Sequence, residues 1–249
     1  MSRGLKTPGT RPKGLTGEEE AAQWVRGMFS AVAPRYDLVN RVISFRLDQY
    51  WRSRTARRLR HILSRPGARV LDLCCGSGDL TLALQAQSCA AVIGSDFCHP
   101  MLLEAARKFR RRAVPSLLFE ADAMRLPVPD SSLDLVTAAF GFRNLANYRK
   151  GLQEMLRVLR PGGAAAVLEF SQPPNRAFRA LYTFYFTRLL PLIGGVISGS
   201  REAYTYLPES VEKFPDAGVL VERMKEAGFG KVEYELMSFG IVALHVGTR

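Results

Sequence analysis

A glycine turn followed by a well-spaced acid is the feature of this chain most suited to binding a small molecule. Gly76-Ser77-Gly78 comes soon after the short, mostly apolar run Arg69–Leu73. Glycines in such a turn let a ligand approach the backbone, whose N–H groups can meet a carboxylate. Asp96 lies about 20 residues further on, where a ribose-binding acid is expected. The turn alone also fits an ordinary tight turn or a nicotinamide site.

A third position favours an adenosine ligand. Asp122 and Ala123 follow another apolar run, and an acid there suits the amine of adenine while the Ala123 N–H suits the ring. Dinucleotide enzymes usually place a third glycine where this chain has Thr81. The pattern therefore predicts S-adenosylmethionine rather than a nicotinamide cofactor, with Gly76, Ser77, Gly78, Asp96, Asp122 and Ala123 as its contacts.

Strands that alternate with helices must position these residues. The predicted strands are 69–73, 90–96, 117–122, 133–138, 164–170, 232–237 and 241–246. The predicted helices are 79–86, 101–112, 148–159 and 219–227. This order indicates an α/β, Rossmann-like fold, a mostly parallel sheet with helices on both faces. Ligands bind such sheets at the carboxyl ends of the strands, where the predicted site residues fall.

The N-terminal part divides into two segments. Residues 1–17 are basic and rich in Gly, Pro and Thr, so we expect a disordered tail and not a signal peptide. Residues 18–63 are predicted to be helical, with Pro34 as an interruption and a second helix over Tyr50–Leu63. One domain is therefore expected over 18–249.

Charge and cysteine content indicate which partners and which redox compartment suit this chain. The net charge is +12, and basic residues cluster over Arg52–Arg60 and Arg107–Arg112. Such runs suit nucleic acid or acidic lipid, although a solvated helix face is the commoner explanation. The four cysteines form no CxxC pair, which predicts free thiols in a reducing, cytoplasmic setting and no metal site.

The most apolar stretch lies at 177–198, within a predicted insert near 176–199. Its length approaches that of a membrane span, but Arg179, Arg188, Pro191 and a glycine pair argue against one. We interpret it as a helix and loop that shape an apolar cleft. A helix for core packing or for a homodimer fits equally well.

Beyond these patterns, the chain resembles the UbiE/MenG family of quinone C-methyltransferases over roughly residues 24–248. The stretches that carry the resemblance are Phe29–Trp51 (FSAVAPRYDLVNRVISFRLDQYW), Val70–Thr81 (VLDLCCGSGDLT), Phe140–Asn144 with RVLRPGG and LEFSQP, and AYTYLPESVEKFP with GIVALHVG. VLDLxxGxGxL and RVLRPGG occur in many methyltransferases. YDxxN, FRN, LEFSxP and YLPES are more specific.

The resemblance implies the class I fold of S-adenosylmethionine-dependent methyltransferases and methyl transfer to a ring carbon of demethylmenaquinol. The ubiquinone precursor, alone or in addition, is the alternative substrate. The resemblance further implies that the cofactor contacts above are correct and that Tyr36 and Arg143 face the quinol. Relatives often have His where this chain has Asp48, and some have Ser where it has Ala139, so neither position is assigned a role.

Ring methylation requires an electron-rich quinol, and deprotonation of a phenol places charge on the neighbouring carbon. We expect Arg143 to stabilise that phenolate and Tyr36 to hydrogen-bond the quinol. His245, in an apolar run, is predicted to be a core residue rather than a base. A polyprenyl quinol predicts peripheral contact with the inner face of the membrane. An RNA-binding methyltransferase is the competing class, but no RNA-binding motif is present.

Overall fold

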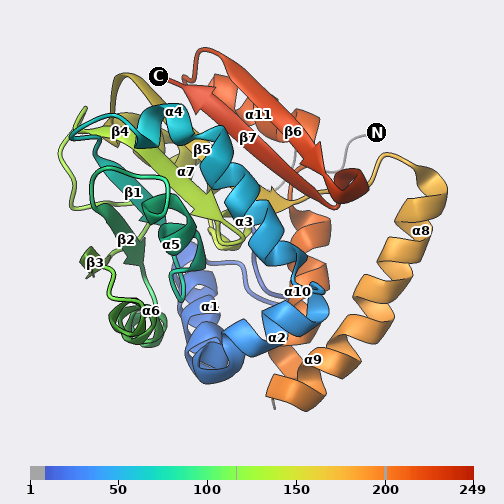
Figure 1. Cartoon of the computed structure of the whole chain (residues 1–249). Coiled ribbons are helices and arrows are strands. Elements are labelled where there is room, and N and C mark those ends of the chain that lie inside the picture. The colour runs from blue at the N-terminus through green and yellow to red at the C-terminus, as the bar shows by residue number, and fades with distance from the viewer. Residues whose placement is uncertain (1–8, 116, 199–200) are drawn as a thin grey trace.

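The computed structural model describes residues 9–115, 117–198 and 201–249 (Figure 1). Seven strands form one sheet in the order β3-β2-β1-β4-β5-β7-β6. They are β1 (Val70–Leu73), β2 (Val92–Asp96), β3 (Leu117–Glu120), β4 (Leu133–Ala139), β5 (Leu159–Phe170), β6 (Val232–Met237) and β7 (Val242–Thr248). β1 to β5 run parallel, whereas β7 is antiparallel to both of its neighbours.

The strand order reverses between β1 and β4, which pair directly. From β1 the chain continues to strands on one side of the sheet, and from β4 to strands on the other side. A crevice therefore opens between the carboxyl ends of these two strands. All four residues of β1 are buried, as expected for a central strand covered on both faces. The predicted Rossmann-like, mostly parallel architecture is confirmed, and the switch point falls where the predicted site residues cluster.

Helices cover both faces of the sheet (Figure 1). They are α1 (Glu18–Val32), α2 (Tyr36–Ile43), α3 (Leu47–Arg58), α4 (Arg60–Leu63), α5 (Asp79–Gln85), α6 (His99–Arg111), α7 (Tyr148–Val158), α8 (Arg176–Phe184), α9 (Leu190–Ser198), α10 (Arg201–Lys213) and α11 (Ala217–Glu226). One core cluster packs α3, α4 and α5 on the sheet, and another packs α7 and α11. Helices α1, α2 and α10 lie below the carboxyl ends of the central strands in Figure 1.

Several predicted boundaries shift. Pro34 does interrupt the N-terminal helices, within a short 3-10 turn, but the helix predicted from Tyr50 begins earlier, at Leu47. Arg46, in the left-handed conformation, separates that helix from α2. α7 ends one residue early and β5 already starts at Leu159, so that Pro161 lies in the strand. Pairing of Leu159 with Leu133 on β4 explains this early start.

Part of the predicted tail packs on the domain. Thr10 is buried, its N–H donates to the carbonyl of Leu145 (3.1 Å), and its hydroxyl bonds that of Tyr148. Lys213 Nζ donates to the carbonyl of Arg11 (2.9 Å). Residues 9–12 are therefore ordered in the structure, which differs from the predicted disorder. Hydrogen bonds to residues far away in the sequence hold this segment, and composition does not reveal such partners. Residues 1–8 lie outside the described residues.

The predicted insert is helical from Arg176 to Ser198, as α8, a π-helical turn over Tyr185–Leu189, and α9. Its buried side chains include Phe186 and Leu190, while no residue of α8 is buried. Throughout the described ranges, no helix combines the length and the apolar character that crossing a membrane requires.

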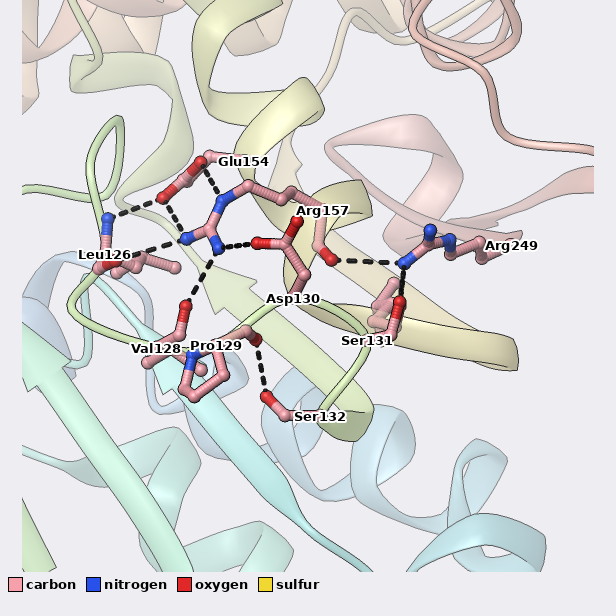
Figure 2. Close-up of polar contacts among 10 residues, drawn as sticks. Leu126, Val128, Pro129, Asp130, Ser131, Ser132, Glu154, Arg157 and Arg249 are labelled. Carbon is pink, nitrogen blue, oxygen red and sulfur yellow. Dashed lines mark hydrogen bonds and ion pairs between the residues drawn. The ribbon is translucent and has the colours of Figure 1, made fainter.

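Arg157, near the end of α7, holds the loop that joins β3 to β4 (Figure 2). Its guanidinium pairs with Asp130 and Glu154 and donates to the carbonyl of Leu126 (3.1 Å). Glu154 in turn accepts from the Leu126 N–H at 2.6 Å, and Arg249 donates to the Arg157 carbonyl at 3.1 Å. This clamp fixes the path of the chain just after the segment that carries the predicted adenine contacts.

Candidate functional site

A cavity of about 960 Å³, including open solvent at its mouth, lies at the carboxyl ends of β1, β2 and β4. Five of the six predicted cofactor contacts line it: Gly76, Ser77, Asp96, Asp122 and Ala123. Because parallel strands end at one edge, the topology brings together residues that are far apart in sequence. We call this space the first cavity.

The glycine turn shapes the floor of the first cavity. Gly76 and Gly78 have φ of 55° and 82°, a region that residues with a Cβ rarely adopt. A Cβ on Gly78 would lie 2.5 Å from Cε1 of Phe109, so this position also requires glycine for packing against α6. Gly78 does not line the cavity, in contrast to the prediction. It instead makes the turn that places Gly76 and Ser77 in the cavity wall.

Asp96 ends β2 and is buried. One carboxylate oxygen accepts the Gly76 N–H and the other the Cys98 N–H, both at 2.9 Å. Burial raises the pKa of Asp96 to about 6, and these N–H donors oppose the rise. Asp122 is exposed and accepts the Met124 N–H at 2.8 Å. A local turn therefore holds its carboxylate at a residue that lines the first cavity.

A second set of contacts ties the N-terminal helices to the glycine turn. Ser77 Oγ donates to Asp37 at 2.5 Å, and Lys108 Nζ lies 2.6 Å from both Asp37 and Asp79. Burial alone would raise the pKa of Asp79, but the Lys108 ammonium lowers it below its ordinary value. These contacts anchor the start of α2 over the first cavity.

A second cavity of about 680 Å³ lies between α1, α2, α3 and α10, and its lining is mostly apolar and aromatic. It shares Phe29, Tyr36, Arg52 and Phe140 with the first cavity. Arg143 lines the second cavity only. The two spaces therefore adjoin at these four side chains, and ligands that reach past them can meet there.

Arg143 is buried and held on several sides. Its Nη1 lies 3.1 Å from Glu169 Oε1 and also donates to the Phe140 carbonyl, while Nε donates to Ser210 at 3.3 Å. The guanidinium carbon lies 5.4 Å from the centre of the Phe170 ring. Burial raises the pKa of Glu169, and the Arg143 charge opposes that rise. Arg143 is thus a fixed, buried cation at the wall of an aromatic cavity, not part of a surface ion pair.

Tyr36, the first residue of α2, lines both cavities. Burial raises its pKa above the ordinary value, while the charges of Arg143 and Arg52 oppose this effect. The phenol is therefore neutral at neutral pH and keeps a proton to donate. The structure brings Tyr36 and Arg143 to the same cavity, and their contact with the quinol stays a prediction.

Sequence reasoning missed two residues that shape the second cavity, Arg52 in its wall and Glu169 behind Arg143. Arg52 forms a buried ion pair with Asp48 at 2.6 Å and lies over the Phe140 ring at 5.1 Å. It belongs to an arginine run that we interpreted as a solvated face. Glu169, the partner of Arg143, stands in the LEFSQP motif, which was noted without a role for its acid. The position of Glu169 within this motif was the sequence signal that could have indicated a role for it.

The remaining residues that could take part in chemistry are a histidine and the cysteines. His245 is buried on β7, bonds the Ala217 carbonyl at 2.9 Å and lines neither cavity, so its prediction as a core residue is confirmed. Burial lowers its pKa to about 4. Cys74 and Cys75 line the first cavity as free thiols, and burial raises the pKa of both. Within the described residues, no group of potential metal ligands gathers.

The chemistry of the two spaces differs. The first presents carboxylates and backbone N–H groups around a glycine turn, which suits a nucleoside that carries positive charge. The second presents aromatic rings and two arginines, which suits a ring that develops negative charge. The arrangement can bring these two kinds of ligand into contact where the cavities meet.

Residues 16–249 match the model of the ubiE/COQ5 methyltransferase family. The demethylmenaquinone methyltransferase of Thermus thermophilus is 51% identical over 223 residues, which cover 89% of this chain and 100% of that protein. The ubiquinone/menaquinone biosynthesis C-methyltransferase UbiE of Geobacter sulfurreducens is 39% identical over 237 residues, 92% of this chain and 90% of that protein. These matches confirm the resemblance predicted from the motifs.

Solved structures agree on the fold. A SAM-dependent methyltransferase from Thermotoga maritima matches with a TM-score of 0.59 and 17% identity, over 89% of this chain and 98% of that one. Another, from Aquifex aeolicus, matches with a TM-score of 0.53 and 18% identity, over 77% and 87%. At such identities the likeness concerns architecture alone, and it confirms the class I methyltransferase fold.

Proposed function

The chain belongs to the ubiE/COQ5 methyltransferase family, and on that premise we propose that it transfers a methyl group from S-adenosylmethionine to a ring carbon of demethylmenaquinol. The observation that carries the proposal is the junction of the two cavities. Tyr36, Arg52 and Phe140 line both spaces, and Arg143 stands in the wall of the second. Two ligands placed there would meet without intervening water.

The first cavity fits S-adenosylmethionine. Asp72, Asp79, Asp96 and Asp122 all line it, which suits a ligand with an ammonium and a sulfonium group. Ser95 Oγ is buried at the same wall without a hydrogen-bond partner among the described residues, so the cavity has an unsatisfied polar atom to offer. We assign Asp96 to the ribose hydroxyls, and Asp122 with Ala123 to the adenine, because all three line this cavity. When bound there, S-adenosylmethionine supplies an electrophilic methyl group.

Arg143 performs the electrostatic part of the proposed mechanism. A quinol becomes nucleophilic at carbon when a phenolic proton leaves, and the resulting phenolate needs a cation that is already in place. Glu169 and the Phe140 carbonyl hold the Arg143 guanidinium, so it need not reorganise as charge develops. Tyr36, kept protonated by its raised pKa, donates a hydrogen bond to a quinol oxygen. Attack by the ring carbon forms the new carbon–methyl bond as the methyl–sulfonium bond breaks, and the ring proton then passes to solvent, which restores aromaticity.

The lining of the second cavity supports an aromatic substrate. Phe29, Trp51, Phe140 and Phe170 contribute rings to it. A long apolar tail on the substrate requires peripheral contact with a membrane. We place that contact at the inner face, with the protein otherwise in the cytoplasm.

Methyl transfer to four substrates under anaerobic conditions tests the function: demethylmenaquinol, its oxidised quinone, the reduced ubiquinone precursor and bulk RNA. We expect turnover of demethylmenaquinol and none of the quinone, because an oxidised ring is too electron-poor to attack a methyl group. Turnover of the ubiquinone precursor would broaden the substrate range. Equal turnover of quinone and quinol would contradict the mechanism, and turnover of RNA alone would contradict the function.

A further inference from the structure

Two aromatic side chains project from strained turns into solvent. Phe45 is 75% exposed with φ of 51°, and Phe239 is 83% exposed with φ of 58°. The left-handed conformation is unfavourable for a residue with a bulky side chain, and Gly or Asn relieves it. Each turn thus carries backbone strain and an exposed ring together. Strain that the fold retains at an exposed position indicates a use for the residue.

Both rings contact the insert. Phe45 lies 6.1 Å from the ring of Tyr185, and Phe239 lies 5.5 Å from the ring of Phe178. α8 runs along the edge of the molecule in Figure 1 and has no buried residue. Large apolar side chains on the insert are exposed as well: Leu181, Phe184, Leu189, Leu192 and Ile193. We call these five residues, with Phe45 and Phe239, the apolar face.

The apolar face is continuous with the second cavity at both tips. Ile43 and Ser44, the two residues before Phe45, line that cavity. Trp51 also lines it, and its indole N–H donates to the hydroxyl of Ser238, the residue before Phe239, at 2.9 Å. An apolar chain that leaves the cavity beside either turn would therefore meet the apolar face rather than water.

The unpaired charge around this face is positive, since Glu233 and Glu235, which precede the Phe239 turn on β6, each pair with an arginine of α3. Segments 38–47 and 171–193 contain Arg41, Arg46, Arg176, Arg179 and Arg188, and neither contains an acidic residue. Within the described part of the chain, none of these five arginines forms an ion pair with a carboxylate. The arginine run on α3 differs, since Arg54 pairs with Glu235 at 3.0 Å and Arg58 with Glu233 at 3.3 Å. Uncompensated positive charge around the apolar face therefore comes from Arg46, Arg176, Arg179 and Arg188, whereas the charge of Arg41 acts on Asp79 beside the first cavity.

We propose that the apolar face docks on an anionic lipid bilayer, with Phe45 and Phe239 inserted among the headgroups and the arginines around them bound to phosphates. This inference rests on the proposed function, in which the substrate has a lipid tail. Apolar residues rimmed by arginines are the composition that binds such surfaces. A second copy of the chain, paired through the same face, would bring two arginine-rich surfaces together, which disfavours a symmetric homodimer there.

Sedimentation with vesicles tests the docking face. We compare the full chain with its Phe45→Asn/Phe239→Asn variant on phosphatidylglycerol–phosphatidylcholine vesicles and on vesicles of phosphatidylcholine alone. Asn suits both left-handed turns, so the variant should fold. We expect its affinity for anionic vesicles at low salt to fall about ten-fold or more, because two partly inserted rings are lost. The matched control, Leu103→Gln/Leu117→Gln, removes two exposed leucines from α6 and β3 and should bind as the wild type does.

Methylation of a soluble and of a long-tailed quinol, together with the oligomeric state, distinguishes a lipid bilayer from a second copy of the chain on the apolar face. Methylation of a short-tailed, soluble quinol should be unchanged in the Asn variant, while methylation of a long-tailed quinol in vesicles should fall with binding. Equal vesicle binding by the wild type and the Asn variant would overturn the proposal, as would a wild-type dimer that the two substitutions dissociate. Vesicle binding is measured without substrate, so it tests the docking face independently of catalysis. Failure of the wild type to methylate the soluble quinol would contradict the proposed function alone.

Discussion

The two cavities are built by different means. The first is formed by strand ends and backbone, and its main polar contacts are N–H groups of Gly76 and Cys98 that hold the Asp96 carboxylate. The second is formed by side chains on helices that come from both ends of the chain, and its fixed charge is Arg143, held by Glu169. Sheet topology therefore determines one cavity, whereas tertiary packing of helices determines the other.

This difference implies that the two cavities should respond separately to substitution. Changes in the first should weaken cofactor binding and leave the chemical step intact. Changes in the second should slow the chemical step and leave cofactor binding intact. Among the four residues that line both, the polar Tyr36 and Arg52 are the positions where that separation should fail.

The largest effect is expected from Arg143→Lys. A lysine keeps the charge beside Glu169 but loses the planar fork that bonds the Phe140 carbonyl and Ser210 while facing the cavity. Loss of a well-placed group at a developing oxyanion costs about 10²–10³ in rate. Single-turnover kinetics at saturating cofactor should show this loss, with cofactor affinity within about two-fold by calorimetry.

The matched control for that substitution is Arg160→Lys, since Arg160 is partly exposed, pairs with Asp134 at 3.0 Å and lines neither cavity. Such pairs contribute about 0–1 kcal/mol, so turnover should not change. A rate near that of the wild type in Arg143→Lys would assign Arg143 to structure alone and remove the charged anchor from the second cavity.

The next effect in size is expected from Asp96→Ala. This change removes a buried carboxylate from the first cavity, and a lost hydrogen bond to a charged group costs about 1.5–3 kcal/mol. Affinity for S-adenosylmethionine should therefore fall about 10- to 150-fold in calorimetry, while the single-turnover rate at saturation stays close to that of the wild type. Glu222→Ala, which breaks an exposed pair with Lys225, serves as the control. Unchanged affinity in Asp96→Ala would remove this residue from the cofactor site.

A smaller effect should follow from pH. Burial raises the pKa of Asp96 to about 6, above the ordinary 3.8 for an aspartate. Above pH 6 the carboxylate is ionised and can accept from both ribose hydroxyls, whereas below pH 6 it takes up a proton. Cofactor affinity should therefore fall about ten-fold between pH 7 and pH 5. Asp72 also has a pKa of about 6, so Asp96→Asn is the control that separates the two acids. A profile identical in that variant would assign the pH dependence elsewhere.

The sequence predicted the first cavity better than the second for the same physical reason. Gly76, Asp96 and Asp122 each follow a short apolar strand, and strand ends of a parallel sheet converge whatever the helices do. The partners of the second cavity are not local. Arg143 and Glu169 belong to different elements, so no periodicity could indicate that they pair, although each stood in a noted motif.

The fold shows the same division. The strands were predicted within a few residues because alternation and buried apolar runs are local signals. The misplaced boundaries lie where tertiary partners decide. Leu159 extends β5 by pairing with β4, Arg46 breaks the helix before α3, and Thr10 orders a segment by bonding a distant carbonyl. Arg52 was interpreted as part of a solvated face because its partners, Asp48 and the Phe140 ring, cannot be inferred from charge alone.

The smallest effect, and the one that tests the separation of the cavities most directly, is expected from Tyr36→Phe. The ring remains and keeps its edge contact with Phe29, whose ring centre lies 6.0 Å away, so both cavities keep their shape. Only a hydroxyl is lost, and one neutral hydrogen bond contributes about 0.5–1.5 kcal/mol, or a two- to ten-fold change.

If that hydroxyl serves the quinol, the single-turnover rate should fall by this factor while cofactor affinity stays constant. If it serves the cofactor, the affinity should fall and the rate at saturation should hold. A fall in both would place Tyr36 at a true junction, where substitution cannot separate binding from chemistry. Phe29→Leu is the matched control, because it alters the shared wall without removing a polar atom. A change in neither quantity would leave Tyr36 as a packing residue and Arg143 as the single polar contact proposed here for the quinol.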